Sequence, residues 1–288
     1  MKLEAFQNVL PEVWMNCVLP EARSIVPELP HDCLAVGAWE QERPIGLAIV
    51  RRAAGEETAH VVSLVVVEEY RREGVGRRIL AGLGNLLKSN GIGILAVEYM
   101  ASCEESGEVG LFLQAVGFAP PVLGVAVWSG KLALFEEMPW VRRMPLPRGL
   151  HVEPWSALTA EQHAYIQSGE ENWYPSILSP LMDGSDTDDE RSLLLRDGER
   201  IVGWMIVEPL DANTIVFKSM FVHASYRRKG RGIALMAESF RRFLHDPTFE
   251  NGIFFVEGDN ADMLAFMRKH LSRPNMREEG MWRTFKRL

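Results

Sequence analysis

Short apolar runs separated by polar turns recur along the chain. Apolar, β-branched segments at 33–39 and 44–50 flank one such turn, and segments at 192–195 and 201–207 flank another. A polar turn between two strand-like runs is typical of a β-hairpin. The pattern therefore predicts one hairpin in each half of the chain.

A helical period follows later in each half, with its apolar residues on one face. These residues are Ile79, Leu80, Leu83 and Leu87 in the first half, and Ile233, Met236, Ala237, Phe240 and Leu244 in the second. The Asn-Gly pairs at 90–91 and 251–252 suit a helix C-cap and turn before the next strands, at 92–97 and 253–256. Each half thus predicts a helix followed by another strand.

The segment between hairpin and helix is repeated. Residues 61–79 and 217–235 share a serine, an apolar run, Tyr-Arg-Arg and Gly-x-Gly, and Arg227 follows Arg71 by 156 residues. Solenoid repeats have periods of about 20–50 residues, so this much longer period indicates duplicated domains.

A segment with three prolines, 138–149, separates the two halves. Proline lacks a backbone N–H and resists regular structure, so we expect a linker there. The predicted domains are then 1–137 and 150–288. The second opens with a strand at 150–155 and a helix at 158–167.

Composition is that of a soluble globular protein. Of 288 residues, 47% are hydrophobic and 24% are charged, and the net charge of −8 argues against a nucleic acid or an anionic membrane as the main partner. No apolar run is long enough to span a membrane, and the first ten residues do not form a signal peptide. The scattered Cys17, Cys33 and Cys103 predict free thiols and no metal site. We expect a cytoplasmic protein.

The repeated Arg-x-x-Gly-x-Gly loop lies where a strand meets a helix. The first turn of a helix has unpaired backbone N–H groups and a positive dipole end, which together suit a phosphate. Glycine lets the backbone approach such a ligand closely. Positive charge surrounds both copies, from Arg71, Arg72, Arg77 and Arg78 and from Arg227, Arg228, Lys229 and Arg231. The loops therefore predict two phosphate-binding sites.

Several phosphate ligands remain open at this point. A P-loop requires Gly-Lys-Ser/Thr, which neither copy has. A dinucleotide fold requires a third glycine where Ile79 and Leu235 stand. Glu98 and Glu257 end the following strands, as a ribose-binding acid would, so a dinucleotide stays a minor alternative.

The order of apolar strand, Arg-x-x-Gly-x-Gly and amphipathic helix resembles motif A of the GNAT acetyltransferase superfamily. The flanking elements match the order in that family over nearly the whole chain, twice. Leu113-Gln-Ala-Val-Gly-Phe118 is similar to the Tyr-x-x-x-Gly-Phe that often ends its last helix, without the tyrosine. The resemblance implies an α/β (mixed α+β) chain of two tandem GNAT-like domains. Each would have a mostly antiparallel, twisted mixed sheet flanked by helices.

The resemblance also implies acetyl-CoA as cofactor. In the family the loop amides hold the pyrophosphate, and the fourth strand pairs with the pantetheine arm like an added strand. The corresponding residues here are Val66, Val67, Arg71, Arg72, Glu73, Gly74, Val75, Gly76 and Arg77, and Phe221, Val222, Arg227, Arg228, Lys229, Gly230, Arg231, Gly232, Ile233 and Asn260.

GNAT catalysis needs few side chains: an amine attacks the thioester, a base takes its proton, and a donor protonates the leaving thiolate. Leu113 and Met267 occupy the place of the usual tyrosine donor. Tyr99, Tyr165 and Tyr174 are the alternative donors, although each also fits a core or interface role.

Four residues are candidates for the remaining catalytic roles. His60 begins the fourth strand of the first copy, and histidine can exchange a proton near neutral pH. Glu98 and Glu257 end strands near the expected acyl group, and Asn260 resembles the Asn that many GNAT domains place after the fifth strand. Exposed strand ends and turn chemistry are the alternative explanations.

The expected function is an acetyl-CoA-dependent N-acetyltransferase acting on a primary amine of a small molecule, with no nucleic-acid or membrane partner. A non-catalytic acyl-CoA-binding or sensing protein, or a peptide or protein N-acetyltransferase, is the alternative. Asn260 and the polar, acidic segment 168–190 favour the second half slightly as the catalytic one, because carboxylates attract a cationic amine.

Overall fold

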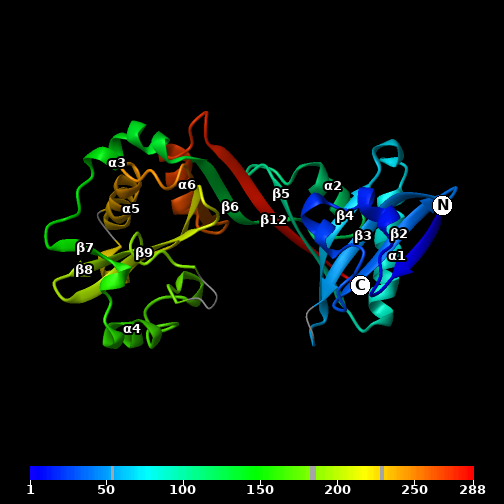
Figure 1. Cartoon of the computed structure of the whole chain (residues 1–288), viewed down its shortest axis with the longest axis horizontal. Helices are drawn as coiled ribbons and strands as arrows, with labels where there is room; N and C mark the ends of the chain where they lie inside the picture. The colour runs from blue at the N-terminus through cyan, green and yellow to red at the C-terminus, as the bar shows by residue number, and fades with distance from the viewer. Residues whose placement is uncertain (53–54, 182–185, 228–229) are drawn as a thin grey trace. The chain divides into compact units, whose positions relative to one another are not determined.

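The computed structural model describes residues 1–52, 55–181, 186–227 and 230–288. The chain divides into two compact units, each described by itself below. The N-terminal unit contains Met1–Gly124 and Gly280–Leu288, and the C-terminal unit contains Val125–Glu279. Both chain ends lie in the N-terminal unit (Figure 1).

A mixed sheet forms the centre of the N-terminal unit. Its neighbouring strands are antiparallel except for the parallel pair β4–β5. In spatial order they are β1 (Lys2–Phe6), β2 (Cys33–Glu40), β3 (Arg43–Arg52), β4 (Thr58–Val66), β5 (Ile94–Ala101) and β12 (Arg277–Arg287). The C-terminal strand β12, red in Figure 1, thus pairs with β5 in this sheet.

Helical elements cover both faces of this sheet. One apolar core includes the buried face of α1 (Val75–Ser89) together with residues of α2 (Gly107–Ala115). A second core lies on the opposite face, under the 3₁₀ helices η1 (Glu12–Cys17) and η2 (Pro20–Ile25). The short 3₁₀ helix η3 (Glu68–Tyr70) leads from β4 toward α1.

The C-terminal unit repeats this plan. Its sheet is antiparallel except for β10–β11, and its strands in spatial order are β6 (Val122–Lys131), β11 (Asn251–Glu257), β10 (Thr214–Val222), β9 (Arg200–Pro209), β8 (Leu193–Asp197) and β7 (Leu150–Pro154). The helical elements are η4 (Leu132–Glu137), α3 (Pro139–Arg143), η5 (Trp155–Ala157), α4 (Ala160–Gln167), η6 (Ser176–Leu178), η7 (Ala224–Tyr226), α5 (Arg231–Phe243) and α6 (Ala261–His270).

Aromatic rings dominate both cores of the C-terminal unit. On the α5 side, the Phe135 ring stacks on Phe240 at 4.1 Å, and Phe217 stacks on Phe254 at 4.4 Å between centroids. Trp204, on the other face, packs against Phe221 at 4.7 Å. Large aromatic pairs of this kind contribute heavily to a core, and the core around Trp204 is more aromatic than the mostly aliphatic core under α1 in the N-terminal unit.

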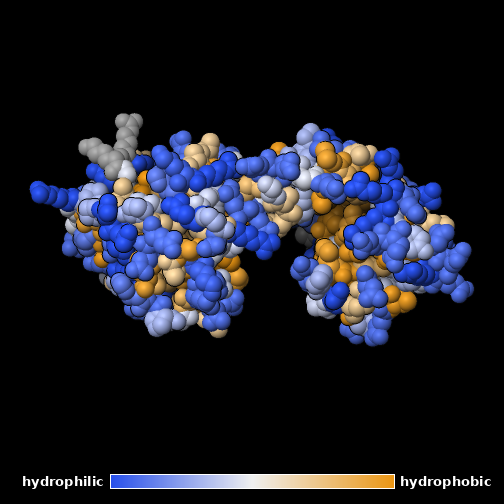
Figure 2. All heavy atoms as spheres, turned by 90° about the horizontal axis from the view of Figure 1, so that it is seen from above, coloured by the Kyte–Doolittle hydropathy of each residue, from blue (hydrophilic) through white to orange (hydrophobic). Residues whose placement is uncertain are grey.

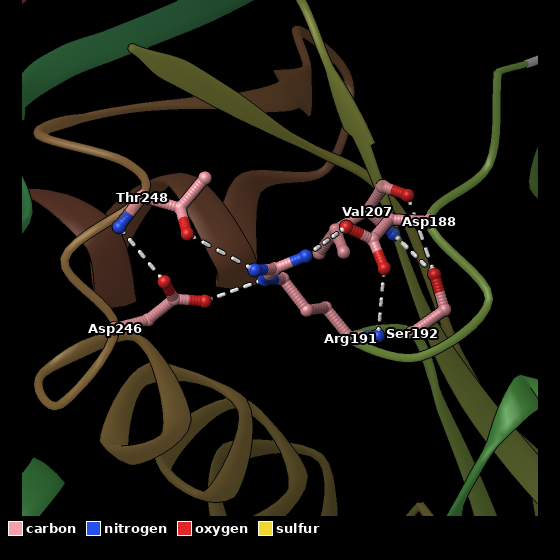
Figure 3. Close-up of polar contacts among 6 residues, drawn as sticks. All are labelled: Asp188, Arg191, Ser192, Val207, Asp246 and Thr248. Carbon is pink, nitrogen blue, oxygen red and sulfur yellow. Dashed lines mark hydrogen bonds and ion pairs between the residues drawn. The ribbon is translucent and has the colours of Figure 1, made fainter. Parts of the chain in front are cut away.

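A polar cluster fastens two loops of the C-terminal unit to each other (Figure 3). The guanidinium of Arg191 donates to Asp188 at 2.7 Å, to Asp246 at 2.5 Å and to Thr248 at 3.3 Å. This arginine holds the pKa of Asp246 down to about 2. The contacts connect the loop before β8 with the loop after α5.

The structure confirms the predicted fold class and both hairpins, which are β2–β3 and β8–β9. The expected C-cap after the first helix is also confirmed. Asn90 ends α1, and Gly91 follows with a left-handed φ of 77°. Such a residue ends a helix at little cost only if it is glycine or asparagine.

One local prediction was wrong. Asn251 and Gly252 belong to β11, where they pair with Lys131 and Gly130, because the ladder extends past the expected turn. The expected linker contains the helix α3, since Pro139 occupies its first turn, where a missing N–H costs nothing.

The compact units also divide the chain at other residues than the ranges 1–137, 138–149 and 150–288. Strand β6 joins β11 in the C-terminal unit, and β12 joins β5 in the N-terminal unit. Each unit thus takes one strand from the other half of the sequence: β12 in the N-terminal unit and β6 in the C-terminal unit. A local sequence pattern cannot reveal such an exchange.

Candidate acetyl-CoA site

The strands β4 and β5 separate partway along their length. Their parallel pairing ends at His60 opposite Ala96, although β4 continues to Val66. In the other unit the β10–β11 pairing ends at Phe217 opposite Phe254, while β10 continues to Val222. In the part of the chain that the structure describes, each fourth strand therefore has an open edge on this side, able to pair with an extended ligand.

The loop after each open strand leads into a helix through a glycine in the left-handed region. Gly74 has φ 80° and Gly230 has φ 72°. The first helical hydrogen bonds run from Arg78 N to the Gly74 carbonyl (3.1 Å) and from Ala234 N to the Gly230 carbonyl (2.9 Å). The three N–H groups before each of these bonds have no acceptor within the helix, which is the arrangement that binds phosphate.

The first arginine of each loop has a structural contact that is the same in both copies. The Arg71 Nε donates to the Val66 carbonyl at 3.1 Å, and the Arg227 Nε donates to the Val222 carbonyl at 3.0 Å. Each arginine thereby fixes the loop to the end of its strand.

The other loop residues of the first copy differ in orientation. Arg72 and Arg77 are exposed, as is Glu73, and Arg72 forms an exposed ion pair with Glu108 at 3.2 Å. The side chain of Val75 is buried in the core, so only its N–H can face a ligand.

In the second copy, Arg228 and Lys229 lie outside the described residues. The Arg231 guanidinium stacks on the Tyr226 ring, 5.1 Å from its centroid. Gly232 and Ile233 form the first turn of α5 with their N–H groups toward its free end.

A cavity of about 430 Å³ lies beside the open end of β4. Its lining is mostly apolar and includes the predicted residues Val66, Val67 and Arg71. The remaining lining residues are Val13, Asn16, Cys17, Arg43, Pro44, Val65, Glu68 and Glu69. Figure 2 shows a hollow with apolar residues on its floor in the N-terminal unit.

The sequence did not predict several of these lining residues. They include Arg43 and the η1 residues Val13, Asn16 and Cys17. The η1 residues belong to no motif, and only the fold brings them to β4. A usable signal was present in the serine shared by the two repeats. Ser63 and Ser219 are both buried, and their hydroxyls bond to the backbone of Leu19 (3.1 Å) and Leu178 (2.9 Å). Each serine therefore ties the segment that covers the sheet to the open strand.

Two catalytic candidates lie on one sheet face in the N-terminal unit. Residues paired across parallel strands share a face, and alternation places Glu98, two residues after Ala96, on the same face as His60. Both side chains are exposed. The register therefore places a carboxylate and an imidazole on one face, near the point where β4 and β5 separate.

Glu257 does not stand in the place of Glu98. Val216, which follows His60 by 156 residues, pairs with Ile253, so Phe255 occupies the position of Glu98. Phe255 is exposed, and Glu257 lies one alternation farther along β11. The two carboxylates are therefore not equivalent.

Asn260 is the N-cap of α6. Its side-chain oxygen accepts from Met263 N at 3.2 Å, the bond that a helix-capping Asn makes. The asparagine therefore has a capping contact of its own, and its role in a cofactor site stays a prediction.

The tyrosine candidates have separate surroundings. Tyr174 is buried, and its hydroxyl donates to the Ile166 carbonyl at 2.9 Å. Tyr165 is exposed and stacks on Trp173. Tyr99 is enclosed between β5 and the start of α2, where burial raises the pKa of its hydroxyl despite the opposing effect of the neighbouring Ser106. Of these three tyrosines, Tyr99 is the one in the N-terminal unit.

The sequence model of the acetyltransferase (GNAT) family matches the chain twice, at residues 3–118 and 152–271. Because the two matches cover well over half of the chain, it belongs to this family, with two GNAT domains in tandem. The protein is accordingly an acetyltransferase, and acetyl-CoA is the acyl donor of the family.

Solved structures with the same tandem fold include a tandem GNAT protein from the clavulanic acid biosynthesis pathway, without AcCoA. It is 16% identical, with a TM-score of 0.59, over 98% of this chain and 98% of that chain. A GCN5-related N-acetyltransferase from Sphaerobacter thermophilus is 14% identical, with a TM-score of 0.57, over 99% and 95%. A search of curated proteins gives no match.

Within the described residues, no group of three or more His, Cys, Asp or Glu side chains is placed to hold a metal ion. The same part of the chain has no helix with the length and apolar character needed to cross a membrane.

Proposed function

We propose that this protein is an N-acetyltransferase that moves the acetyl group of acetyl-CoA to a primary amine of a small molecule. The observation that carries the proposal is in the N-terminal unit. There an open strand edge, a loop with unpaired N–H groups and a cavity all meet at the end of β4.

The residues of this unit suit a pyrophosphate-bearing acyl thioester. A Cβ built on Gly74 would have no atom within 4 Å, so there is room for a phosphate at the helix start. The N–H groups of Val75, Gly76 and Arg77 would hold the pyrophosphate, and the backbone of Val66 and Val67 would pair with the pantetheine arm. The bound thioester supplies an electrophilic carbonyl carbon.

The reaction forms one N–C bond and breaks one C–S bond, and coenzyme A leaves as a thiol. Glu98 is the proposed base for the proton that the ammonium form of the amine must lose, with His60 as its neighbour on the same face. Tyr99 is the proposed donor to the leaving sulfur, in place of the absent tyrosine at Leu113. Acid–base assistance of this kind is worth about 100-fold or more in rate.

The test is thiol release from acetyl-CoA across a panel of small primary amines, with Glu98→Gln beside the wild type. At least one amine should stimulate release, and Glu98→Gln should lower kcat about 100-fold with little change in acetyl-CoA affinity. Glu257→Gln is the matched control and should behave like the wild type. Tight acetyl-CoA binding without release for any amine would refute the proposal.

A non-catalytic acyl-CoA-binding protein is the second candidate, and one observation favours it. Leu113 and Met267, which stand where the family places its tyrosine, are both buried core residues. This function predicts a partner protein whose binding changes with acetyl-CoA. A pull-down with and without acetyl-CoA would count against it if the retained proteins were the same.

A further inference from the structure

The two open strands end in different surroundings. Val65, Val66 and Val67 are half-buried and line the cavity of the N-terminal unit. Their counterparts 156 residues later are Phe221, Val222 and His223. Phe221 is 1% exposed and Val222 is 7% exposed, so the strand end that borders a cavity in one unit is covered in the other.

The side chain of Trp173 lies against this second strand end. Its ring is 5.6 Å from Phe221, 6.1 Å from His223 and 5.5 Å from Trp204, between centroids. Gly169 makes room for it, because a Cβ there would lie 1.8 Å from the indole nitrogen. The indole therefore occupies a fitted position over the residues that match the cavity lining of the other unit.

The glycine that precedes the second helix also has a close neighbour. A Cβ on Gly230 would lie 3.7 Å from the Met144 Cε, in van der Waals contact, whereas Gly74 has no such neighbour. The Arg241 guanidinium holds this segment in place by donating to the carbonyl of Met144 at 3.1 Å and to that of Val141. Gly74 is exposed and Gly230 is only partly so.

From these differences we infer that acyl-CoA binds in the N-terminal unit alone, and that Trp173, Phe221 and Met144 exclude it from the C-terminal copy. This inference rests on the proposed function. Acyl-CoA entering the second copy would have to displace an indole packed on Phe221 and Trp204, as well as the Met144 methyl group. The chain keeps the loop of the second copy but fills its ligand space with its own side chains.

The binding unit is then the N-terminal one, whereas the sequence favoured the second half. That preference came from Asn260 and from the segment 168–190. Asn260 caps a helix, and the same segment supplies Trp173, which fills the site instead of serving it.

Calorimetric titration of acetyl-CoA into the full chain tests the inference. We expect one binding site per chain, at least 10-fold weaker binding in Gly74→Glu, and unchanged binding in Gly230→Glu. Because glutamate at Gly74 is also strained by its positive φ, Arg77→Glu provides a second test on an exposed side chain of the first helical turn. Lys88→Glu, with the same charge change at the far end of α1, is the matched control and should bind like the wild type.

Two sites per chain, or loss of binding in Gly230→Glu with retention in Gly74→Glu and Arg77→Glu, would overturn the inference but not the proposed function. No binding to the wild type would overturn both. Single-site binding together with an absence of thiol release from any amine would leave the inference standing and refute the transferase proposal.

Discussion

The two units share a loop and differ in what surrounds it. In each copy an arginine Nε holds the last carbonyl of the open strand, and a left-handed glycine starts the helix. A cavity borders the strand end in the N-terminal unit, while Trp173 packs on Phe221 at the strand end of the C-terminal unit. The motif therefore specifies a backbone conformation, and the residues packed against it determine whether a ligand has room.

This difference has an origin in composition. Each unit must cover the face of its sheet opposite the long helix. The N-terminal unit does so with η1 and η2 around Trp14, which leaves space beside Val65. The C-terminal unit uses Trp155, Tyr174, Trp204 and Phe221, with Trp173 packed against them. Each bulky aromatic side chain buries about 150–250 Å² of surface. A unit rich in such side chains therefore has a larger buried core and less room for a ligand.

Removing β12 should produce the largest difference between the two units, because it destabilises the N-terminal unit more than the C-terminal unit. A chain that ends at Met276 lacks the strand that pairs with β5 from Ile94 to Ala101, and it lacks Leu288, which packs against the core of the N-terminal unit. We expect hydrogen exchange at β5 to become fast while β9 and β10 stay protected.

Deleting residues 2–6 is the control for that truncation, because it removes the mostly exposed edge strand β1 from the same sheet. Protection of β5 should then persist. Equal protection of β5 in the full chain and in the chain that ends at Met276 would show that the strand exchange is not needed for the fold.

Arg191→Ala should destabilise the C-terminal unit by about 2 kcal/mol. The substitution leaves Asp188 and Asp246 without their shared cation, and these carboxylates are only 12% and 18% exposed. Urea unfolding followed by a probe in this unit would measure the change. In the N-terminal unit the Arg51–Asp32 pair is more exposed, at 51% and 33%. Arg51→Ala should therefore lower the free energy of unfolding by less than about 1 kcal/mol.

The same contact predicts a pH dependence with a definite sign. The pKa of Asp246 falls from 3.8 to about 2 in the folded chain, so its ion pair contributes stability above about pH 4. That contribution is lost as the pH falls toward about 2. The difference between wild type and Arg191→Ala should therefore be smaller at about pH 3 than at pH 7. An equal difference at both values would contradict the assignment of the shift to this arginine.

Arg71→Ala should weaken acetyl-CoA binding about 10-fold, because a hydrogen bond from a charged donor to the Val66 carbonyl is worth about 1.5–3 kcal/mol and fixes the loop. The matched change, Arg227→Ala, should leave the dissociation constant unaltered. It removes a guanidinium 5.7 Å from the Phe221 ring, so its effect should appear in stability. Weaker binding in both variants would mean that both copies bind.

Local patterns predicted much of this structure, and longer-range pairing explains what they missed. The hairpins, the glycine loops and the end of α1 follow from residues close in sequence. The exchange of β6 and β12 depends on partners more than a hundred residues apart. The cavity depends on η1, which reaches β4 only through the fold. The expected equivalence of Glu98 and Glu257 failed because these two residues are 159 positions apart, whereas the corresponding positions of β5 and β11 are 157 apart.

Asn260→Ala should have the smallest effect, and it separates a cap from a ligand residue. Loss of the bond to Met263 N should cost about 1 kcal/mol of stability in the C-terminal unit. Acetyl-CoA affinity and thiol release should not change, because the binding unit is the other one. Asn260→Asp keeps a capping oxygen and should recover the stability. A several-fold loss of affinity in Asn260→Ala, with Asn260→Asp equally impaired, would instead place this amide in a cofactor site and reopen the second copy as a binding unit.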